Sequence, residues 1–461
     1  MTSAKNSKMY ENKIILAPMV RIGTLPTRVL SLRYGADLVY TEEIIDFKLI
    51  KSVRRVNEAL NTIDYVESTD GSLVLRICPF EKSRLVLQMG TSCPDRALKV
   101  AKLVENDVAA IDINMGCPKE FSVKGGMGVA LLYNLENAKK ILSNLVQNSK
   151  IPITCKIRIM PEVEKTIEIA RELEATGISA IGVHGRSRDE RPRHPCHTDQ
   201  IKAVASALQI PVIANGGSKE ISNYDAIIKF KEITGASSVM VARSAQWNCS
   251  VFRKEGPLPI DDVIKEYLKL AIQYDNAFGN TKYNLQNILR EIQETELGKR
   301  FLACQSTEEL CEIWDLVEYF KEHESKKTHL DSAVRREIIK ENPNKKIKLD
   351  QENCRDVTIH NVRYLKSKYK ENESPKSILY LHSTKNKLPA PKYEINCEGK
   401  LFQAIVTYKE KQYSSSYLEV SKRYAEQSAA LACIFSLGLV TEEQLIKDGI
   451  LLNTVTLKNE K

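Results

Sequence analysis

The sequence predicts an α/β protein: a TIM (β/α)8 barrel, then a small helical domain, then a compact α-β-β-β-α module. Three observations predict this fold class. Eight short apolar runs alternate with helix-period segments over about the first 250 residues, helical periodicity alone follows, and a strand pattern then returns. The 461 residues, 43% apolar and 28% charged, suffice for two or three folded domains.

The eight apolar runs have the character of buried parallel strands. They lack strict alternation of apolar and polar residues, as expected for strands covered on both faces. A doubly wound sheet is the alternative fold, but the first run continues as APMVRIGTLP and lacks the GxGxxG turn of that fold. The runs are Ile14–Met19, Ala36–Glu42, Leu85–Gly90, Ala109–Gly116, Ile153–Arg158, Ala180–Arg186, Pro211–Gly217 and Ser237–Arg243.

Helical patterns separate these strands, and we assign residues 1–256 to the barrel. An additional apolar segment, Leu73–Ile77, precedes Leu85–Met89, and the two predict an inserted hairpin that leads into the third barrel strand. The predicted helices are Pro94–Glu105, Glu136–Gln147, Glu162–Thr176 and Glu220–Ile233.

The rest of the chain divides into four parts. Residues 257–340 show helical periodicity alone, residues 341–373 are a polar linker with a basic extension, and residues 441–461 are a C-terminal tail. Residues 374–440 form the α-β-β-β-α module between them. Its predicted elements are Ser377–Thr384, Pro391–Glu398, Leu401–Lys409, Lys411–Val420 and Lys422–Leu437.

Cysteine usage and charge indicate the compartment and the partner. The 11 cysteines are odd in number and scattered without a CxxC pair, which favours reduced thiols in the cytosol or nucleus. The polar N-terminus and the strand-length apolar runs predict no membrane span. The net charge of +9 is small, but residues 341–461 hold 20 basic and 15 acidic residues, so more than half of it is concentrated there.

Polar residues gather at the carboxyl ends of the predicted strands, where a barrel of this kind has its active site. Gly216 and Gly217 follow the seventh strand, and Ala242 and Arg243 follow the eighth. Glycine lets backbone N–H groups approach phosphate oxygens, and arginine can donate two hydrogen bonds to them. These ends therefore predict a phosphate site.

Three further strand-end residues suit a flavin mononucleotide (FMN) bound through that phosphate. Lys156 would place positive charge near the ring N1, Gln88 could bond the pyrimidine edge, and His184 would line the same mouth. Each residue alone is also compatible with an ordinary turn, surface or core position. Their joint placement at consecutive strand ends favours a functional site.

Cys117 lies directly after the fourth strand and is followed by the glycine-rich segment KGGMG. A thiol on a loop over a flavin can donate a proton to carbon. The alternative is a buried structural cysteine. We adopt that alternative for the cysteines in or beside apolar runs, namely Cys78, Cys155, Cys249, Cys304, Cys311 and Cys433.

Several motifs, taken in chain order, resemble those of the tRNA-dihydrouridine synthases. They are APMVRIGTLPTR, QMG, DINMGCPKEFSVKGGMG, CKIR, VHGRSRDER, VIANGG and VMVAR, over residues 14 to about 245. The NMGCP block with its following GGMG is specific to this family, whereas APM and NGG are shared more broadly among flavin barrels. With the C-terminal module, the chain resembles the eukaryotic members that act on position 20 of the tRNA D-loop.

The resemblance implies an enzyme in which NADPH or NADH reduces bound FMN and the reduced flavin gives hydride to uracil C6. Cys117 matches the family's cysteine that protonates C5, and Asn114 matches the position that holds the target uracil. Glu43, Arg186 and Arg188 fall among the positions for substrate RNA. The positions for FMN are Pro18, Met19, Val20, Gln88, Lys156, His184, Asn215, Gly216, Gly217, Ala242 and Arg243.

The C-terminal module resembles a double-stranded RNA-binding domain through SPKSILYLHSTKNK, APKYEI and the helix that begins at Lys422 and Arg423. Positive charge at a helix start adds to a terminus that already favours phosphate, and such modules read the shape of A-form RNA. Lys376 and, in the basic extension, Arg363 and Lys366 are further candidates for RNA contact. A protein-interaction domain is the alternative.

Two other functions are open from the sequence: an FMN barrel that reduces a free pyrimidine or another small molecule, and a non-catalytic RNA-binding protein. His194, Cys196 and His197 resemble a metal site only superficially, since a fourth ligand of suitable spacing is lacking, and we expect no metal. We expect a monomer that binds tRNA in the cytoplasm. A nucleus-directed patch at Lys345, Lys346 and Lys348 is less favoured than a solvated linker.

Overall fold

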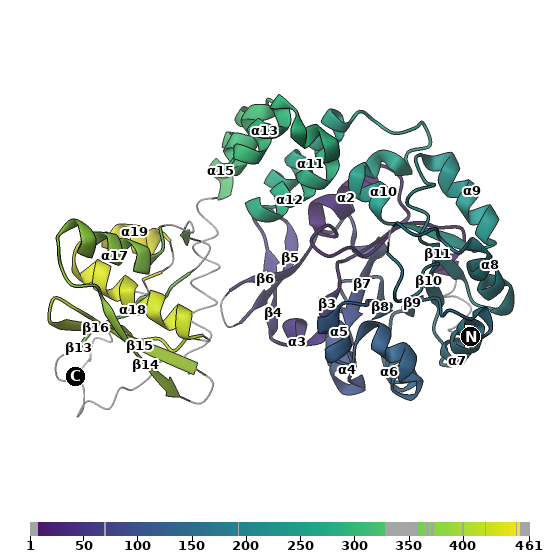
Figure 1. Cartoon of the computed structure of the whole chain (residues 1–461), viewed down its shortest axis with the longest axis horizontal. Coiled ribbons are helices and arrows are strands. Elements are labelled where there is room, and N and C mark those ends of the chain that lie inside the picture. Colours follow the sequence, from purple (N-terminus) through teal and green to yellow (C-terminus); the bar gives the residue numbers. More distant parts are fainter. Residues whose placement is uncertain are drawn as a thin grey trace. The chain divides into compact units, whose positions relative to one another are not determined.

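All eight predicted barrel strands form, and they close into one parallel barrel (Figure 1). Strands pair in parallel from β2 through β1 and β12 to β7, and a pairing of β2 with β7 closes the ring. The predicted TIM barrel is therefore confirmed. The strands are β1 (Ile14–Leu16), β2 (Leu38–Tyr40), β7 (Leu85–Gly90), β8 (Ala110–Met115), β9 (Ile153–Arg158), β10 (Ala180–His184), β11 (Val212–Asn215) and β12 (Ser238–Val241).

The structure is a computed structural model, in which the chain forms two compact units. The first is Met1–Glu67 with Ser72–Ser325, and most of the second is Lys326–Lys461. The residues described are 8–68, 71–191, 193–327, 357–365, 368–369, 373–398, 401–419, 421–448 and 450–451.

The barrel strands are mostly apolar because both of their faces are buried. Side chains that point into the barrel form one cluster, with Ile15, Val86, Ala110 and Met240 among its members. Their sequence neighbours, such as Leu16, belong to the larger cluster under the surrounding helices. Strand alternation thus separates two apolar layers instead of an apolar face from a polar one.

Helices cover the outside of the barrel (Figure 1). The side chains of Asn134 and Asn223 cap two of them by accepting from the N–H three residues further on. The four predicted helices correspond to α4, α6, α7 and α9. The helices are α2 (Leu25–Arg33), α4 (Pro94–Val104), α5 (Glu120–Lys124), α6 (Leu135–Asn148), α7 (Val163–Glu174), α8 (Thr198–Ala207), α9 (Tyr224–Thr234) and α10 (Arg243–Trp247), with 3-10 turns at Lys8–Tyr10, Lys82–Arg84, Gly128–Tyr133 and Cys249–Phe252.

A three-stranded antiparallel sheet is inserted between β2 and β7. It consists of β4 (Ser52–Asn57), β5 (Thr62–Glu67) and β6 (Leu73–Ile77), and it follows β3 (Ile44–Ile45) and α3 (Asp46–Ile50). The predicted hairpin of β6 with β7 is wrong, because β6 pairs with β5 and β7 pairs with β2, β3 and β8. The sequence analysis missed β4 and β5, since their alternation is interrupted by charged residues.

The helical segment after the barrel belongs to the first unit and shares its core, to which Val263, Leu268, Leu285 and Phe301 contribute. The last predicted helical pattern, residues 329–340, lies outside the described residues. The elements are α11 (Ile260–Gln273), α12 (Phe278–Leu289), a 3-10 turn at Arg290–Glu294, α13 (Glu296–Ala303), α14 (Thr307–Ile313) and α15 (Val317–Lys327).

The second unit contains the predicted α-β-β-β-α module. Its core lies between the sheet and the helices and includes Leu379, Val406, Leu431 and Ile434. The predicted strand over Lys411–Val420 ends earlier, at Ser415. The elements are α17 (Pro375–Lys385), β14 (Lys392–Glu398), β15 (Leu401–Tyr408), β16 (Lys411–Ser415) and α18 (Lys422–Ser436).

Two further elements extend this module beyond the predicted pattern. Strand β13 (Val357–His360), from the expected linker and extension, pairs in parallel with β16, and Val362 beyond it is fully buried. Helix α19 (Glu442–Lys447), from the expected tail, buries Leu445 in the same core. Part of both segments is therefore folded.

Among the residues that the structure describes, no helix is long and apolar enough to cross a membrane.

Candidate active site

The interior positions of the barrel change from apolar to polar along several strands. On β8, Ala110 belongs to the apolar floor, and Asp112 and Asn114 follow on the same face because side chains repeat every two residues. The register sets Gln88 beside Asp112, and Asn114 beside Lys156. Strand alternation therefore directs the polar groups of neighbouring strands to one mouth.

Most of the predicted cofactor residues lie at or just beyond strand ends, whereas Gln88 and Lys156 lie within the last half of β7 and β9. Pro18, Met19 and Val20 follow β1, and His184 ends β10 beside Asn215 of β11. Val20 is exposed, whereas Gln88 and Asn215 are buried. The later members are Gly216 and Gly217 after β11, and Ala242 and Arg243 after β12.

The loop after β8 holds Cys117 in a defined position. The Asn114 Oδ1 accepts from the N–H groups of Gly116 and Cys117, at 3.0 and 3.1 Å. On the other side, the Val129 N–H donates to the Cys117 carbonyl at 3.0 Å, and the Ser122 hydroxyl lies 3.4 Å from the Cys117 Sγ. The Cys117 residue is half-buried, so it is not sealed in the core.

Gly128 explains part of the glycine-rich segment. Its φ is +60°, and a Cβ there would lie 2.5 Å from the Cys117 carbonyl oxygen. A larger residue would therefore displace the cysteine loop. The six cysteines expected to be structural are all buried, as predicted: Cys78, Cys155, Cys249, Cys304, Cys311 and Cys433.

Glu43 lies beside this cysteine loop. Burial raises the pKa of its carboxyl above the usual value, and the Asn114 amide and Cys117 thiol next to it oppose that shift. One carboxyl oxygen, Oε1, is buried and has no hydrogen-bond partner among the residues that the structure describes. Glu43 thus adds a carboxyl of raised proton affinity next to the thiol.

Asp112 is a site residue that the sequence analysis missed. Its Oδ2 accepts from the Gln88 amide at 2.8 Å and its Oδ1 from the Thr154 hydroxyl at 2.7 Å. Burial raises its pKa to about 6. The signal in the sequence is one acidic residue within an otherwise apolar strand, in DINMG.

Positive charge dominates the other half of the mouth. Burial and Arg158 lower the pKa of Lys156 to about 8, and among the described residues its ammonium has no ion-pair partner. Burial, together with the positive charges of Lys156, Arg158, Arg186 and Arg243, lowers the pKa of His184 well below its usual value. His184 is therefore neutral, and the cluster as a whole suits an anionic ligand.

Arg186 braces the glycine loop after β11. Its Nη1 donates to the Gly216 carbonyl at 2.8 Å and lies 3.3 Å from the His184 Nε2, and its Nε donates to the His194 carbonyl. Gly216 has a φ of +127°, and a Cβ there would lie 2.6 Å from the Cys196 Sγ. Arg186 is buried, and its side chain supports the loop through these hydrogen bonds. Arg188, in contrast, is exposed.

Arg158 ties two loops of the mouth together. Its Nε donates to the Gly116 carbonyl next to Cys117, and its Nη1 donates to the Ser187 carbonyl, both at 2.8 Å. Arg158 is the last residue of β9 and is not among the predicted site residues. The bonds couple the cysteine loop to the arginine loop after β10.

The histidines near Cys196 are engaged in local hydrogen bonds. His197 Nε2 lies 2.7 Å from a Glu190 carboxyl oxygen, and His194 Nδ1 accepts from the Arg191 N–H at 2.8 Å. Within the described parts of the chain, no group of three or more His, Cys, Asp or Glu residues is placed to hold a metal ion.

In the second unit, the predicted RNA contacts have different surroundings. Lys422 and Arg423 are exposed at the start of α18. Lys376 forms an ion pair with Glu426 at 2.6 Å. Arg363 is largely buried, 3.5 Å from Glu419, and so holds the extension on the module. Lys366 lies outside the described residues.

Comparisons with known proteins agree with both units. The chain matches the family described as Dihydrouridine synthase (Dus) over residues 15–301 and the double-stranded RNA binding motif over residues 375–437. It is 42% identical over 291 residues to the tRNA-dihydrouridine(20) synthase of Schizosaccharomyces pombe, covering 61% of this chain and 60% of that protein.

A second yeast protein and one solved domain structure are also similar to parts of this chain. The tRNA-dihydrouridine(20) synthase of Saccharomyces cerevisiae is 38% identical over 321 residues, covering 65% of this chain and 83% of that protein. The crystal structure of the double-stranded RNA-binding domain of a tRNA-dihydrouridine(20) synthase is 34% identical, with a TM-score of 0.18, and covers 18% of this chain and 89% of that structure. The chain spans less than two thirds of the length of the Schizosaccharomyces pombe relative.

Proposed function

The chain belongs to the dihydrouridine synthase family, and from this premise we propose that it reduces a uridine of the tRNA D-loop, at position 20, to 5,6-dihydrouridine. The observation that carries the proposal is the position of Cys117: a half-buried thiol held by Asn114 at the mouth of a barrel lined with cations. The names of both yeast relatives specify the same position and NAD(P)+.

The residues at the mouth fit FMN as the cofactor. Lys156 offers an ammonium without an ion-pair partner among the described residues, and Arg243 adds a second cation. Gly216 and Gly217 pack so closely against Cys196 and Phe230 that a Cβ on either would lie within 2.6 Å of those side chains, which fixes the backbone of this loop beside the cations. When bound, FMN would supply hydride to uracil C6 after its reduction by NADPH or NADH.

The protein's own groups would supply the proton and the orientation. Cys117 would donate its proton to C5 of the uracil, which a positioned thiol can do efficiently. Asn114 would position the thiol through the two N–H groups it binds, and also offers its amide to the base. Lys156 would stabilise negative charge on the reduced ring.

The target base must leave its stack to reach this mouth. That step costs a few kcal/mol and is least costly in a single-stranded loop, as in a tRNA D-loop. We propose that the second unit binds the duplex part of the same tRNA, with Lys422 and Arg423 on phosphates. We further propose a monomer that acts in the cytoplasm, with the nucleus as a second location.

The test uses the full chain with unmodified tRNA and NADPH. Purified protein should be yellow and release FMN, and mass mapping should show a gain of two hydrogen atoms on a single D-loop uridine. Colourless protein that FMN cannot reconstitute would contradict the proposal. Turnover of free uracil but not of tRNA would instead favour an oxidoreductase of small molecules.

A further inference from the structure

A pocket lies beside the mouth, within the first unit, and we call it the rim pocket. It is lined by residues 23–26 after β1, residues 41–42 after β2, residues 73–76 of the inserted sheet and residues 274–277 before α12. Its volume is about 240 Å³, enough for a planar ring system but not for a whole nucleotide. Neither the cofactor nor the thiol chemistry uses this pocket.

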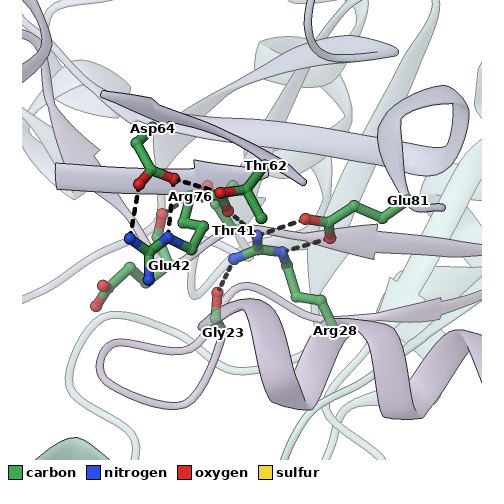
Figure 2. Close-up of polar contacts among 8 residues, drawn as sticks. All are labelled: Gly23, Arg28, Thr41, Glu42, Thr62, Asp64, Arg76 and Glu81. Atoms are coloured by element: carbon green, nitrogen blue, oxygen red, sulfur yellow. Dashed lines mark hydrogen bonds and ion pairs between the residues drawn. The ribbon is translucent and has the colours of Figure 1, made fainter. Parts of the chain in front are cut away.

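Both arginines of the rim pocket are already neutralised. Figure 2 shows Arg28 turned to Glu81 and Arg76 turned to Asp64, each through two hydrogen bonds of 2.6 to 2.8 Å. Their remaining donors reach the backbone carbonyls of Gly23, Arg76 and Tyr274. No free guanidinium is thus left for a phosphate.

The remaining charge of the rim pocket is negative. The Glu42 carboxylate accepts from the Arg21 N–H at 2.8 Å, and among the described residues it has no ion-pair partner. Its free lone pairs favour a ligand that donates N–H groups. The walls are apolar, with Leu25, Leu73 and Leu75, so the pocket suits an uncharged ring with N–H donors at its edge.

The rim pocket is next to the thiol. Glu42 lines it, while the following residue, Glu43, lies beside Asn114 and Cys117. Consecutive Cα atoms are about 3.8 Å apart, so the pocket and the thiol's surroundings are lined by neighbouring residues of one chain segment. In a single-stranded loop, neighbouring bases can be splayed into separate pockets.

We propose that the rim pocket binds a nucleobase of the tRNA loop adjacent to the target uridine. The inference rests on the proposed function, because it names a second contact of the same substrate. The base would lie between the apolar walls and donate to Glu42. It would hold the loop so that the target uracil is presented to Cys117.

The test fills the pocket from its exposed side. Leu73 is 47% exposed, so Leu73→Trp should fold normally, and Ala277→Trp fills the pocket from the segment before α12, where Ala277 is also exposed. Each variant should raise KM for unmodified tRNA about tenfold, as expected when one bound base loses its pocket, with less change in kcat. Ile233→Trp, at an exposed position on α9, is the matched control and should behave as wild type.

A second measurement identifies the base. Removing the base on one side of the target should raise KM for wild type about tenfold and should not raise it further for Leu73→Trp. Unchanged KM in both pocket variants, or additive effects with every abasic tRNA, would overturn the proposal. If wild-type protein forms no dihydrouridine at all, the proposed function fails and this inference fails with it.

Discussion

Asp112 and Gln88 lie side by side on adjacent barrel strands, and the Gln88 amide donates to the Asp112 carboxylate at 2.8 Å. Because a carboxylate only accepts, this bond fixes the NH2 group of Gln88 toward Asp112 and leaves its carbonyl oxygen for other partners. Thr154 satisfies the other carboxyl oxygen. The orientation of one predicted cofactor ligand therefore depends on a buried acid behind it.

The same acid should give the protein a distinctive pH dependence. The pKa of Asp112 is raised to about 6, above that of an aspartate in the unfolded chain, so the folded state favours its protonated form. Its contribution to the free energy of unfolding is greatest at low pH and should fall by about 3 kcal/mol as the pH rises from 4 through 6. Asp112→Asn cannot titrate. The free energy of unfolding of wild type relative to this variant, measured by urea unfolding, should therefore fall as the pH rises. A constant difference would contradict the raised pKa.

Removing the thiol should separate cofactor binding from turnover. Cys117→Ala should keep its bound flavin but lose about a hundredfold to ten-thousandfold of dihydrouridine formation, the usual contribution of a positioned proton donor. Single-turnover assays with reduced enzyme and unmodified tRNA measure this step. Cys397→Ala, which removes an exposed thiol on β14, is the control and should leave the rate unchanged. Normal turnover by Cys117→Ala would refute the role of the thiol.

The close approach of Gly128 to Cys117 predicts a sensitive position. Gly128→Ala should displace the cysteine loop, because its Cβ would lie 2.5 Å from the Cys117 carbonyl oxygen at a φ of +60°. We expect a loss of about 1–3 kcal/mol in stability and a fall in kcat while bound flavin is retained. Gly279→Ala is the control, since a Cβ there meets nothing within 4 Å. Equal kinetics for the two variants would show that the loop tolerates the shift.

Charge reversal at the start of α18 should weaken tRNA binding in a salt-dependent way. Lys422→Glu with Arg423→Glu should lower affinity and reduce the slope of log K against log salt by about two, one for each phosphate contact. Filter binding or fluorescence anisotropy over a salt series measures both quantities. The control is Lys385→Glu with Lys387→Glu, which changes the charge equally. Both residues are exposed; Lys385 ends α17 and Lys387 follows it. An unchanged slope in the first variant would exclude these two residues from phosphate contact.

The sequence predicts the barrel well because its strands are uniform in character. Strands such as β1 and β2 are buried on both faces, so their apolar residues are consecutive and easily recognised. Cys117 and the paired glycines are also recognisable, because they follow such strands directly. A candidate site residue can therefore be predicted from local sequence where it directly follows a recognisable strand.

Long-range pairing is what the sequence does not reveal. The partner of β6 depends on whether β5 or β7 offers a free edge, and the burial of Arg363 depends on Glu419, which lies far along the chain. Asp112 is hidden for a similar reason. Its importance arises only when Gln88 and Thr154 are brought beside it from two other strands.

Strand β13 has a consequence for how the second unit is made. The Ser415 hydroxyl donates to the Val362 carbonyl, 53 residues earlier in the chain, and β13 pairs with β16 in the same region. During synthesis this segment emerges well before its partner exists, so its pairing must wait for a large loop to close. We expect the β13 amides to be the last of the sheet to gain protection when refolding is followed by pulsed hydrogen exchange. We thus expect the edge of this sheet to be completed last, by the segment of the module that is translated before the other strands.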